Sequence, residues 1–141
     1  MNKILVVYYS STGNTQQMAE QIVQGITSAG GEADLVEVNA APAIDGYEKI
    51  AFGCPAMGAE NLEEAEFEPF FASIEGQLSG KKVALFGSYD WGDGQWMRDW
   101  QDRVLADGAN LFNNEGLIVN GTPDAEGDAL CNKFGSDFSK F

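Results

Sequence analysis

Residues 3–15 read KILVVYYSSTGNT, an apolar run joined directly to a cluster of polar side chains. The run at 3–9 is continuous and rich in β-branched and aromatic residues, which is typical of a strand buried on both faces of a parallel sheet. Apolar residues then recur with helical spacing at Met18, Ile22 and Ile26, ahead of a glycine pair. This stretch therefore predicts a central strand, a polar loop and a helix.

The rest of the chain repeats the order of strand, then helix. Further strands are predicted at 33–38, 49–53, 82–87 and 117–119, the last with an optional extension at 109–112. Helical spacing of apolar residues marks 67–78, 96–104 and 130–138, with Thr122 and Pro123 as the N-cap and first turn of the last helix. Helical crossovers join parallel strands and place helices on both faces. We expect a three-layer, doubly wound α/β sandwich with a five-stranded parallel sheet.

Length and composition favour one soluble domain. The chain has 141 residues, the size of a common domain, so we treat 1–141 as a single unit. Hydrophobic residues make up 44% of it, and mean hydropathy is −0.21. No apolar run approaches the roughly 20 residues that a membrane span needs. The first residues lack the pattern of a secretion signal, so we expect no membrane association and a cytoplasmic location.

Charge and residue usage exclude several classes of function. The formal net charge is −14, which disfavours nucleic acid and favours a basic protein partner. The chain has no histidine, so histidine bases and imidazole metal ligands are excluded. Cys54 and Cys131 lie far apart and are expected to be small buried residues. Segment 50–80 has no Lys or Arg but six glutamates, which form either a solvated helix face or a docking surface.

The loop at 10–15 has the composition of a phosphate site. In open α/β sheets, ligands bind beyond the carboxyl ends of the strands, so loops 10–15, 54–61 and 88–94 are the candidates. The first loop lies at a helix N-terminus, where backbone N–H groups attract anions. Hydroxyl, amide and glycine positions in it are Ser10, Ser11, Thr12, Gly13, Asn14 and Thr15. A helix cap would explain one or two hydroxyls, but not five donor side chains in six positions. Because the loop has no P-loop lysine, it is suited to hold a phosphate that is not transferred.

SSTGNT after KILVVYY resembles the FMN phosphate loop of the flavodoxin family. The similarity continues through all five strands, and the region LIVNGTPD lacks the long insertion of long-chain members. The chain is therefore similar to the short-chain flavodoxins. The resemblance implies a flavodoxin-like sheet order of 2-1-3-4-5 and non-covalently bound FMN.

The other two loops extend this resemblance. Residues 57–60 (MGAE) are similar to the family's redox-sensitive turn, and 88–92 (SYDWG) to the loop over the opposite flavin face. Met57 and Trp91 would then pack against opposite faces of the flavin ring, which needs apolar contacts on both faces. The resemblance further implies that Glu60 accepts a hydrogen bond from flavin N3–H. The predicted cofactor-binding residues are Ser10, Ser11, Thr12, Gly13, Asn14, Thr15, Pro55, Ala56, Met57, Gly58, Ala59, Glu60, Ser88, Tyr89, Asp90, Trp91 and Gly92.

In flavodoxins the peptide corresponding to Gly58-Ala59 turns over on one-electron reduction, so that its carbonyl meets the new N5–H of the semiquinone. Three residues depart from the family pattern near the flavin. Pro55 lacks a backbone donor. Ala59 stands where Asp or Gly is familiar, and it would weaken semiquinone stabilisation if the reduced turn needs a positive φ there. Asp90 replaces a usual Gly, and a carboxylate beside the flavin would disfavour the anionic hydroquinone.

The resemblance implies a low-potential one-electron carrier that uses the semiquinone/hydroquinone couple of FMN. It would act as a monomer, without catalytic residues of its own and not as an enzyme, and would shuttle electrons between redox enzymes that present basic docking surfaces. The alternative is an FMN-dependent NAD(P)H:quinone reductase of the same fold, which needs room over the flavin that Trp91 would occupy. A signalling domain of this fold would need an Asp after the third strand and a Lys after the fifth, where Gly53-Cys54 and Asn120-Gly121 stand.

Overall fold

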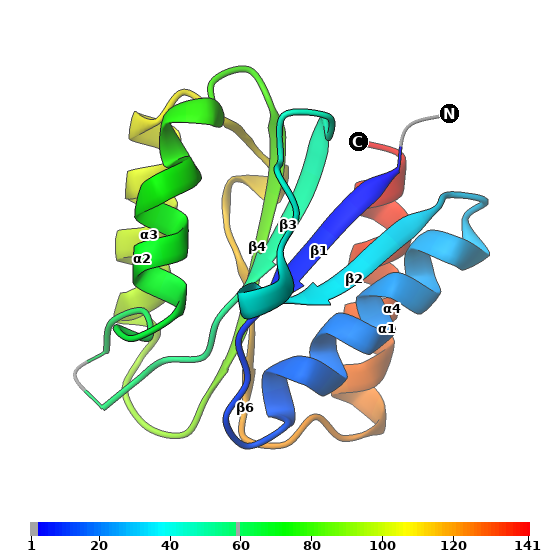
Figure 1. Cartoon of the computed structure of the whole chain (residues 1–141). Helices are drawn as coiled ribbons and strands as arrows, with labels where there is room; N and C mark the ends of the chain where they lie inside the picture. The colour runs from blue at the N-terminus through cyan, green and yellow to red at the C-terminus, as the bar shows by residue number, and fades with distance from the viewer. Residues whose placement is uncertain (1–2, 59) are drawn as a thin grey trace.

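The computed structural model describes residues 3–58 and 60–141. Its core is a parallel sheet whose strands follow the order β2-β1-β3-β4-β5, with β6 paired to β4 (Figure 1). The strands are β1 (Ile4–Tyr8), β2 (Ala33–Glu37), β3 (Lys49–Gly53), β4 (Lys82–Tyr89), β5 (Asn110–Leu111) and β6 (Leu117–Asn120). The predicted order 2-1-3-4-5 is confirmed, and β2 is an edge strand as expected.

Helices cover both faces of this sheet (Figure 1). Helices α1 (Asn14–Ser28) and α4 (Ala125–Ser139) lie on one face, and α2 (Phe67–Ile74) and α3 (Gln95–Ala106) lie on the other. Short 3₁₀ turns follow three elements at Val38–Ala40, Glu75–Gln77 and Phe112–Asn114. The doubly wound, three-layer α/β architecture is therefore confirmed.

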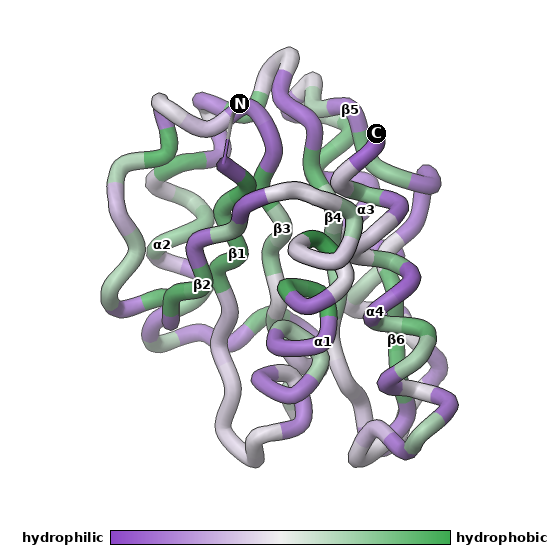
Figure 2. The backbone as a smooth tube through the Cα atoms, turned by 90° about the vertical axis from the view of Figure 1, so that its right-hand side faces the viewer, coloured by the Kyte–Doolittle hydropathy of each residue, from purple (hydrophilic) through white to green (hydrophobic). Residues whose placement is uncertain are grey.

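Strand β1 shows why the opening sequence produces this fold. All five of its residues are buried. Leu5 and Val7 point into the core under α2 and α3, whereas Ile4, Val6 and Tyr8 point into the core under α1 and α4. Because side chains alternate across a strand, a continuous apolar run serves two cores at once. Figure 2 shows this hydrophobic centre as green strands between purple outer segments.

The fifth strand position differs from the prediction. Two short strands share it: β5 pairs with the start of β4 and β6 with its end. Between them, Asn113 and Asn114 adopt left-handed backbone conformations with φ of 62° and 57°. Asparagine tolerates this region better than most residues, so the chain leaves the sheet and returns to it. The predicted extension at 109–112 is thus a separate segment of strand.

The last helix begins and packs differently from the prediction. Thr122 is not its N-cap: the Asp124 carboxylate accepts the N–H of Gly127 at 2.8 Å, and α4 starts after it. The predicted apolar stripe is also wrong at Leu130, which is 49% exposed. Cys131 is buried instead. It lies three residues before Phe134, and residues three or four positions apart lie on the same face of a helix. Among the described residues, no helix is long and apolar enough to cross a bilayer.

Candidate cofactor site

The carboxyl ends of β1, β3 and β4 bring the three predicted loops together at the lower edge of the sheet in Figure 1. They form a cavity of about 180 Å³. Its lining consists of Ser11, Thr12, Asn14, Pro55, Ala56, Met57, Gly58, Ser88, Tyr89, Asp90 and Trp91. Every lining residue is one of those predicted from the sequence. Ala59, also predicted, lies outside the described residues.

The first loop presents backbone donors at the start of α1. Gly13 is the N-cap residue with φ of 94°, a left-handed conformation that glycine adopts without strain. A Cβ built on Gly13 would meet nothing within 4 Å, so the loop leaves open space on that side. Within the described parts of the chain, the N–H groups of Thr12, Asn14 and Thr15 have no acceptor. The N–H groups and the positive end of the helix dipole suit a phosphate.

Two of the hydroxyls in this loop have partners within the chain. Ser10 Oγ accepts the N–H of Gly13 at 3.0 Å and shapes the loop. Thr15, 1% exposed, pairs its Oγ1 with Ser88 Oγ at 3.0 Å and accepts the N–H of Ser88 at 3.3 Å. Thr15 and Ser88 therefore tie the first loop to the third. The exposed side chains of Ser11 and Thr12 and the half-buried Asn14 amide remain for a ligand.

Three backbone N–H groups of the second loop donate to carbonyl groups of the chain itself. Ala56 N–H donates to Ser88 O at 3.0 Å, Met57 N–H to Asn61 O at 3.2 Å, and Glu60 N–H to Met57 O at 2.8 Å. Pro55 has no N–H at all. This loop therefore offers a ligand carbonyl oxygens and the thioether of Met57, but no amide from these four residues. Like Pro55, Ala56, Met57 and Glu60 therefore have no backbone N–H available for the flavin.

Glu60 has one engaged and one unengaged carboxylate oxygen. Its backbone lies in the left-handed region with φ of 51°. Oε1 accepts the N–H of Asp93 at 3.1 Å, whereas Oε2 is buried and has no hydrogen-bond partner among the described residues. A buried acceptor without a donor costs roughly 1 to 3 kcal/mol. A ligand N–H, such as that of flavin N3, would remove this cost.

The third loop supplies an aromatic surface and more open donors. Trp91 is 63% exposed and lines the same cavity as Met57. The N–H groups of residues 90–92 have no acceptor in the described structure. Asp90 is exposed, and its carbonyl accepts the Asn120 side-chain amide at 3.3 Å. Asn120, which also donates to Tyr89 O at 3.2 Å, fixes this loop and was not predicted. Its only signal in the sequence is its place directly after a strand.

Glu63 stands three residues from Glu60 but has a different environment. Its side chain is 7% exposed and accepts three N–H groups, from Ala65, Glu66 and Phe67, at 2.7 to 2.9 Å. Burial alone would raise the pKa of this carboxyl, but the three donors outweigh burial and hold the pKa below its ordinary value. Glu63 thus caps the approach to α2.

The acidic segment has several partners inside the chain. Arg103 on α3 binds Glu68 and Glu75 at 2.7 Å each, so two of the six glutamates join α2 to α3. Glu64 accepts the Asn61 side-chain amide at 2.7 Å and stays exposed, as does Glu66. Only part of the segment is therefore an unpartnered acidic surface.

The two cysteines are free, and both are buried as predicted. Burial raises the pKa of both thiols to about 12. Cys54 Sγ accepts the N–H of Glu63 at 3.4 Å, and its carbonyl accepts the Trp96 indole N–H at 3.1 Å. Neither thiol is a nucleophile at neutral pH. In the part of the chain that the structure describes, no group of three acidic or cysteine side chains could hold a metal ion.

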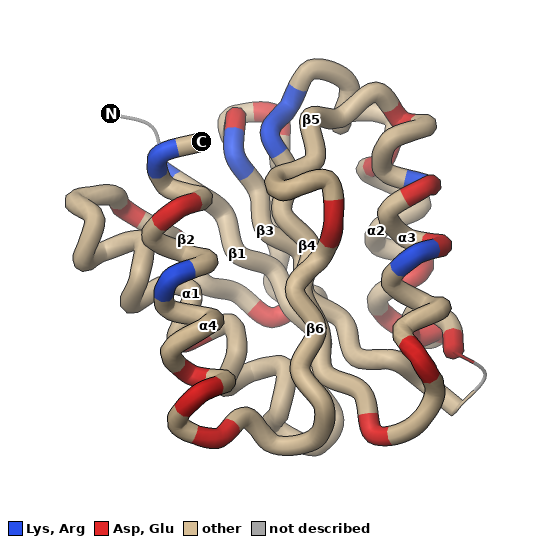
Figure 3. The backbone as a smooth tube through the Cα atoms, turned by 180° about the vertical axis from the view of Figure 1, so that it is seen from behind, with Lys and Arg blue, Asp and Glu red and all other residues tan. Residues whose placement is uncertain are grey.

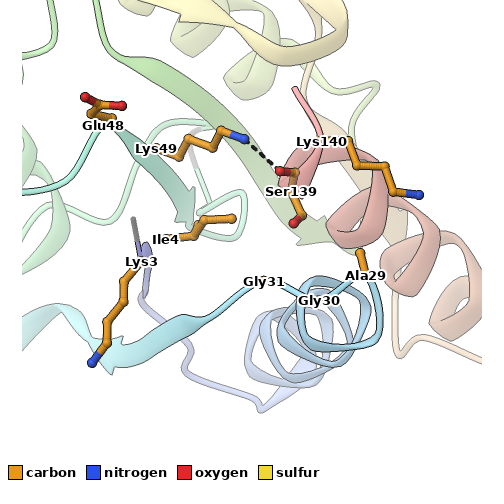
Figure 4. Close-up of a pocket in the computed structure, with 9 residues that line it drawn as sticks. All are labelled: Lys3, Ile4, Ala29, Gly30, Gly31, Glu48, Lys49, Ser139 and Lys140. Carbon is orange, nitrogen blue, oxygen red and sulfur yellow. Dashed lines mark hydrogen bonds between the residues drawn. The ribbon is translucent and has the colours of Figure 1, made fainter. Parts of the chain in front are cut away.

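A second cavity, of about 380 Å³, lies at the opposite end of the sheet (Figure 4). Lys3, Lys49 and Lys140 line it together with the ends of α1 and α4. Lys49 Nζ donates to Ser139 O at 2.7 Å, while Lys3 and Lys140 point away from it (Figure 4). Helix C-terminal carbonyls disfavour an anion, and Lys49 neutralises them. This cavity therefore does not suit a phosphate.

The carboxyl-edge cavity combines the features that FMN needs. Donors for a phosphate lie in its first loop, and Met57 and Trp91 offer apolar surfaces for a planar ring. Glu60, whose Oε2 has no partner among the described residues, lines another cavity together with Trp96 and Arg103. The residues present fit FMN.

Comparisons with known proteins agree with this chemistry. The sequence model of the family described as flavodoxin matches residues 6–134. A flavodoxin from Clostridium beijerinckii is 46% identical over 132 residues, which cover 92% of this chain and 94% of that protein. A flavodoxin from Megasphaera elsdenii is 44% identical over 121 residues, covering 84% and 87%. The solution structure of two-electron reduced M. elsdenii flavodoxin superposes with a TM-score of 0.88 at 39% identity, covering 98% of this chain and 99% of that one.

Proposed function

This chain belongs to the flavodoxin family and is an FMN-binding electron carrier, and we propose that residues 1–141 act as one domain that holds FMN at the carboxyl edge of the sheet. The observation that carries this assignment is the distribution of unpartnered polar groups. Among the described residues, N–H groups of the first and third loops have no acceptor, and Glu60 Oε2 has no donor. Together they complement the phosphate, ring carbonyls and N3–H of FMN.

Each loop has a separate task in this proposal. Ser11, Thr12 and Asn14, with the N–H groups at the start of α1, hold the phosphate. Met57 and Trp91 would cover the two faces of the ring and exclude water from it. Glu60 would accept a hydrogen bond from N3–H, and the N–H groups of residues 90–92 would donate to the ring carbonyls. FMN, when bound, supplies reversible transfer of one electron at a time, and the chain orients it and sets its potential.

The surroundings favour a low potential. The three loops contain no Lys or Arg but three carboxylates, Glu60, Asp90 and Asp93, of which Asp90 lines the cavity. Figure 3 shows the same end of the molecule in tan and red. Negative charges near the ring oppose the addition of further negative charge to it, most strongly where water is excluded. Bound FMN is therefore expected to be a strong reductant when fully reduced.

The chain is proposed to be a carrier without catalytic residues of its own, acting as a monomer in the cytoplasm. It has no histidine, and burial suppresses the acidity of both thiols. The net charge of −14 and the exposed Glu64 and Glu66 favour redox partners with basic docking surfaces.

Stepwise anaerobic reduction of the FMN-loaded protein tests this function. Two separated one-electron steps, with a long-wavelength absorption band that rises in the first and falls in the second, are expected. A single two-electron step without the band would favour the NAD(P)H:quinone reductase alternative. Failure of the colourless apoprotein to take up FMN would overturn the site itself.

A further inference from the structure

We infer that Arg98 is a positioning residue for the flavin site, because it fixes residue Asp93, whose backbone N–H orients the Glu60 carboxylate. The inference rests on the proposed role of Glu60 as the acceptor for flavin N3–H. Arg98 lies on α3, outside all three loops, and touches none of the residues that line the cavity in the described hydrogen-bond network.

Arg98 donates hydrogen bonds to both the main chain and the side chain of Asp93. Its Nη1 donates to Asp93 O at 2.9 Å, and its Nη2 donates to Asp93 Oδ1 at 2.9 Å and to Gln95 Oε1 at 2.8 Å. Helix α3 is anchored by Trp96 and Trp100, which are 1% and 2% exposed. A planar guanidinium fork on a fixed helix can hold the carbonyl and the carboxylate of one residue together, which a single ammonium group does less well.

The residue that Arg98 holds by its carbonyl and side chain contacts Glu60 through its backbone N–H. Asp93 N–H donates to Glu60 Oε1 at 3.1 Å, and within the described residues no other donor reaches this carboxylate. The carboxylate also lies against Gly92: a Cβ built there would be 1.5 Å from Oε1. Gly92 has φ of 89°, so glycine is needed both for the backbone and for the contact. The orientation of Glu60 therefore depends on the position of the 92–93 peptide.

The effect of Arg98 should be modest. Its side chain is 49% exposed and that of Asp93 is 80% exposed. Exposed ion pairs are screened by water and contribute little. The bond to the Asp93 carbonyl is the part that a plain surface ion pair would lack. We expect Arg98→Gln to weaken FMN binding by about threefold, and Glu60→Ala to weaken it more.

The test compares Arg98→Gln and Arg98→Lys with Lys133→Gln, each in the natural and the Glu60→Ala background. Lys133→Gln is a matched control, since it removes the same charge from an exposed pair with Asp137 on α4. Arg98→Lys keeps the charge but loses the fork. FMN dissociation constants of the apoproteins are measured by fluorescence quenching. The proton shift of N3–H is measured with ¹⁵N-labelled FMN in the natural background.

The expected result is weaker binding and an upfield N3–H shift for both Arg98 variants, no change for Lys133→Gln, and no further loss from Arg98→Gln once Glu60 is Ala. An Arg98 effect equal to that of Lys133→Gln, or one that persists in the Glu60→Ala background, would overturn the inference. If Glu60→Ala neither weakens binding nor moves N3–H, the proposed role of Glu60 fails first. If Glu60→Ala does both and Arg98→Gln does neither, only the positioning role fails.

Discussion

The two ends of the sheet differ in whether the chain itself supplies partners for the polar groups there. At the amino end, lysines donate to backbone carbonyls of the same chain: Lys49 to Ser139, Lys81 to Tyr47, and Lys82 to Phe141, at 2.6 to 2.8 Å. Figure 3 shows these cations gathered near the chain termini. At the carboxyl end, N–H groups of the first and third loops and one Glu60 oxygen lack a described partner.

This difference separates groups that support the fold from groups that await a ligand. Parallel strands and right-handed crossovers direct helix C-termini to one end and helix N-termini to the other. The first end needs cations, which the chain supplies as lysines. The second end attracts anions, and the chain supplies no carboxylate to the start of α1. A cavity of larger volume at the amino end is thus the less promising ligand site.

Loss of the phosphate should produce the largest effect. Riboflavin, which lacks the phosphate of FMN, is expected to bind the apoprotein about a thousandfold more weakly, because two or three charge-assisted hydrogen bonds at the start of α1 are lost. Competitive fluorescence titration of riboflavin and FMN measures the ratio. Equal affinity for the two would contradict the contrast between the ends, since the open donors would then have no anion to bind.

Glu63 differs from Glu60 at the carboxyl end, because both of its carboxylate oxygens accept N–H groups of the chain. Glu63→Gln should lower the free energy of unfolding by about 2 kcal/mol at pH 7 through loss of charge-assisted bonds. The folded pKa lies below the unfolded one, so the stabilisation is present above the unfolded pKa and disappears as pH falls through the folded pKa. Urea unfolding of the two apoproteins at pH 7 and pH 3 measures this. A pH-independent difference would show that the carboxylate charge is not the cause.

Lys49 tests the amino end. Lys49→Met removes donors to the last carbonyls of α4 and should lower the free energy of unfolding by about 1 kcal/mol, while the FMN dissociation constant stays within about twofold. Lys3→Met is the control, since Lys3 is exposed and forms a long ion pair with Asp34, with 3.7 Å between Nζ and Oδ1. Thermal unfolding and FMN titration are read together. A large loss of FMN affinity would mean that the two ends are not independent.

Asp107 is the exception at the amino end, and its effect should be small and confined to high pH. One of its carboxylate oxygens is buried without a described partner. Burial and the neighbouring Glu75 raise the pKa of Asp107 to about 6, although Arg103 opposes this. Ionisation of Asp107 therefore lowers the free energy of unfolding as pH rises from the ordinary pKa of a carboxyl group to about 6. Asp107→Asn should raise the unfolding free energy by about 1 kcal/mol at pH 8 and by nothing near pH 4. Urea unfolding at both values checks it, and an equal gain at pH 4 would exclude the charge as the cause.

The sequence was most informative where a pattern is local. A continuous apolar run predicted β1, helical spacing predicted α1 to α3, and the polar loop at 10–15 predicted the donors at the start of α1. Predictions were wrong where neighbouring positions compete: Asp124 caps α4 in place of Thr122, and Cys131 is buried in place of Leu130.

Contacts across long separations in the sequence were not predictable from the residues alone. Thr15 reads as a phosphate donor, yet it pairs with Ser88, 73 positions away. Asn120 and Arg98 carry no motif, because each acts on backbone groups whose position only the folded chain defines. The left-handed turns that split the fifth strand likewise depend on how the chain packs beneath α4.

The most direct test of the central claim is a titration of ¹⁵N-labelled apoprotein with FMN, followed by amide chemical shifts. The account predicts large shifts at residues 10–15, 55–60 and 88–93, and none at 29–31, 48–49 and 139–140 around the amino-end cavity. Shifts that gather at the amino end, or that spread evenly over both ends, would contradict the assignment of the flavin site to the carboxyl edge of the sheet.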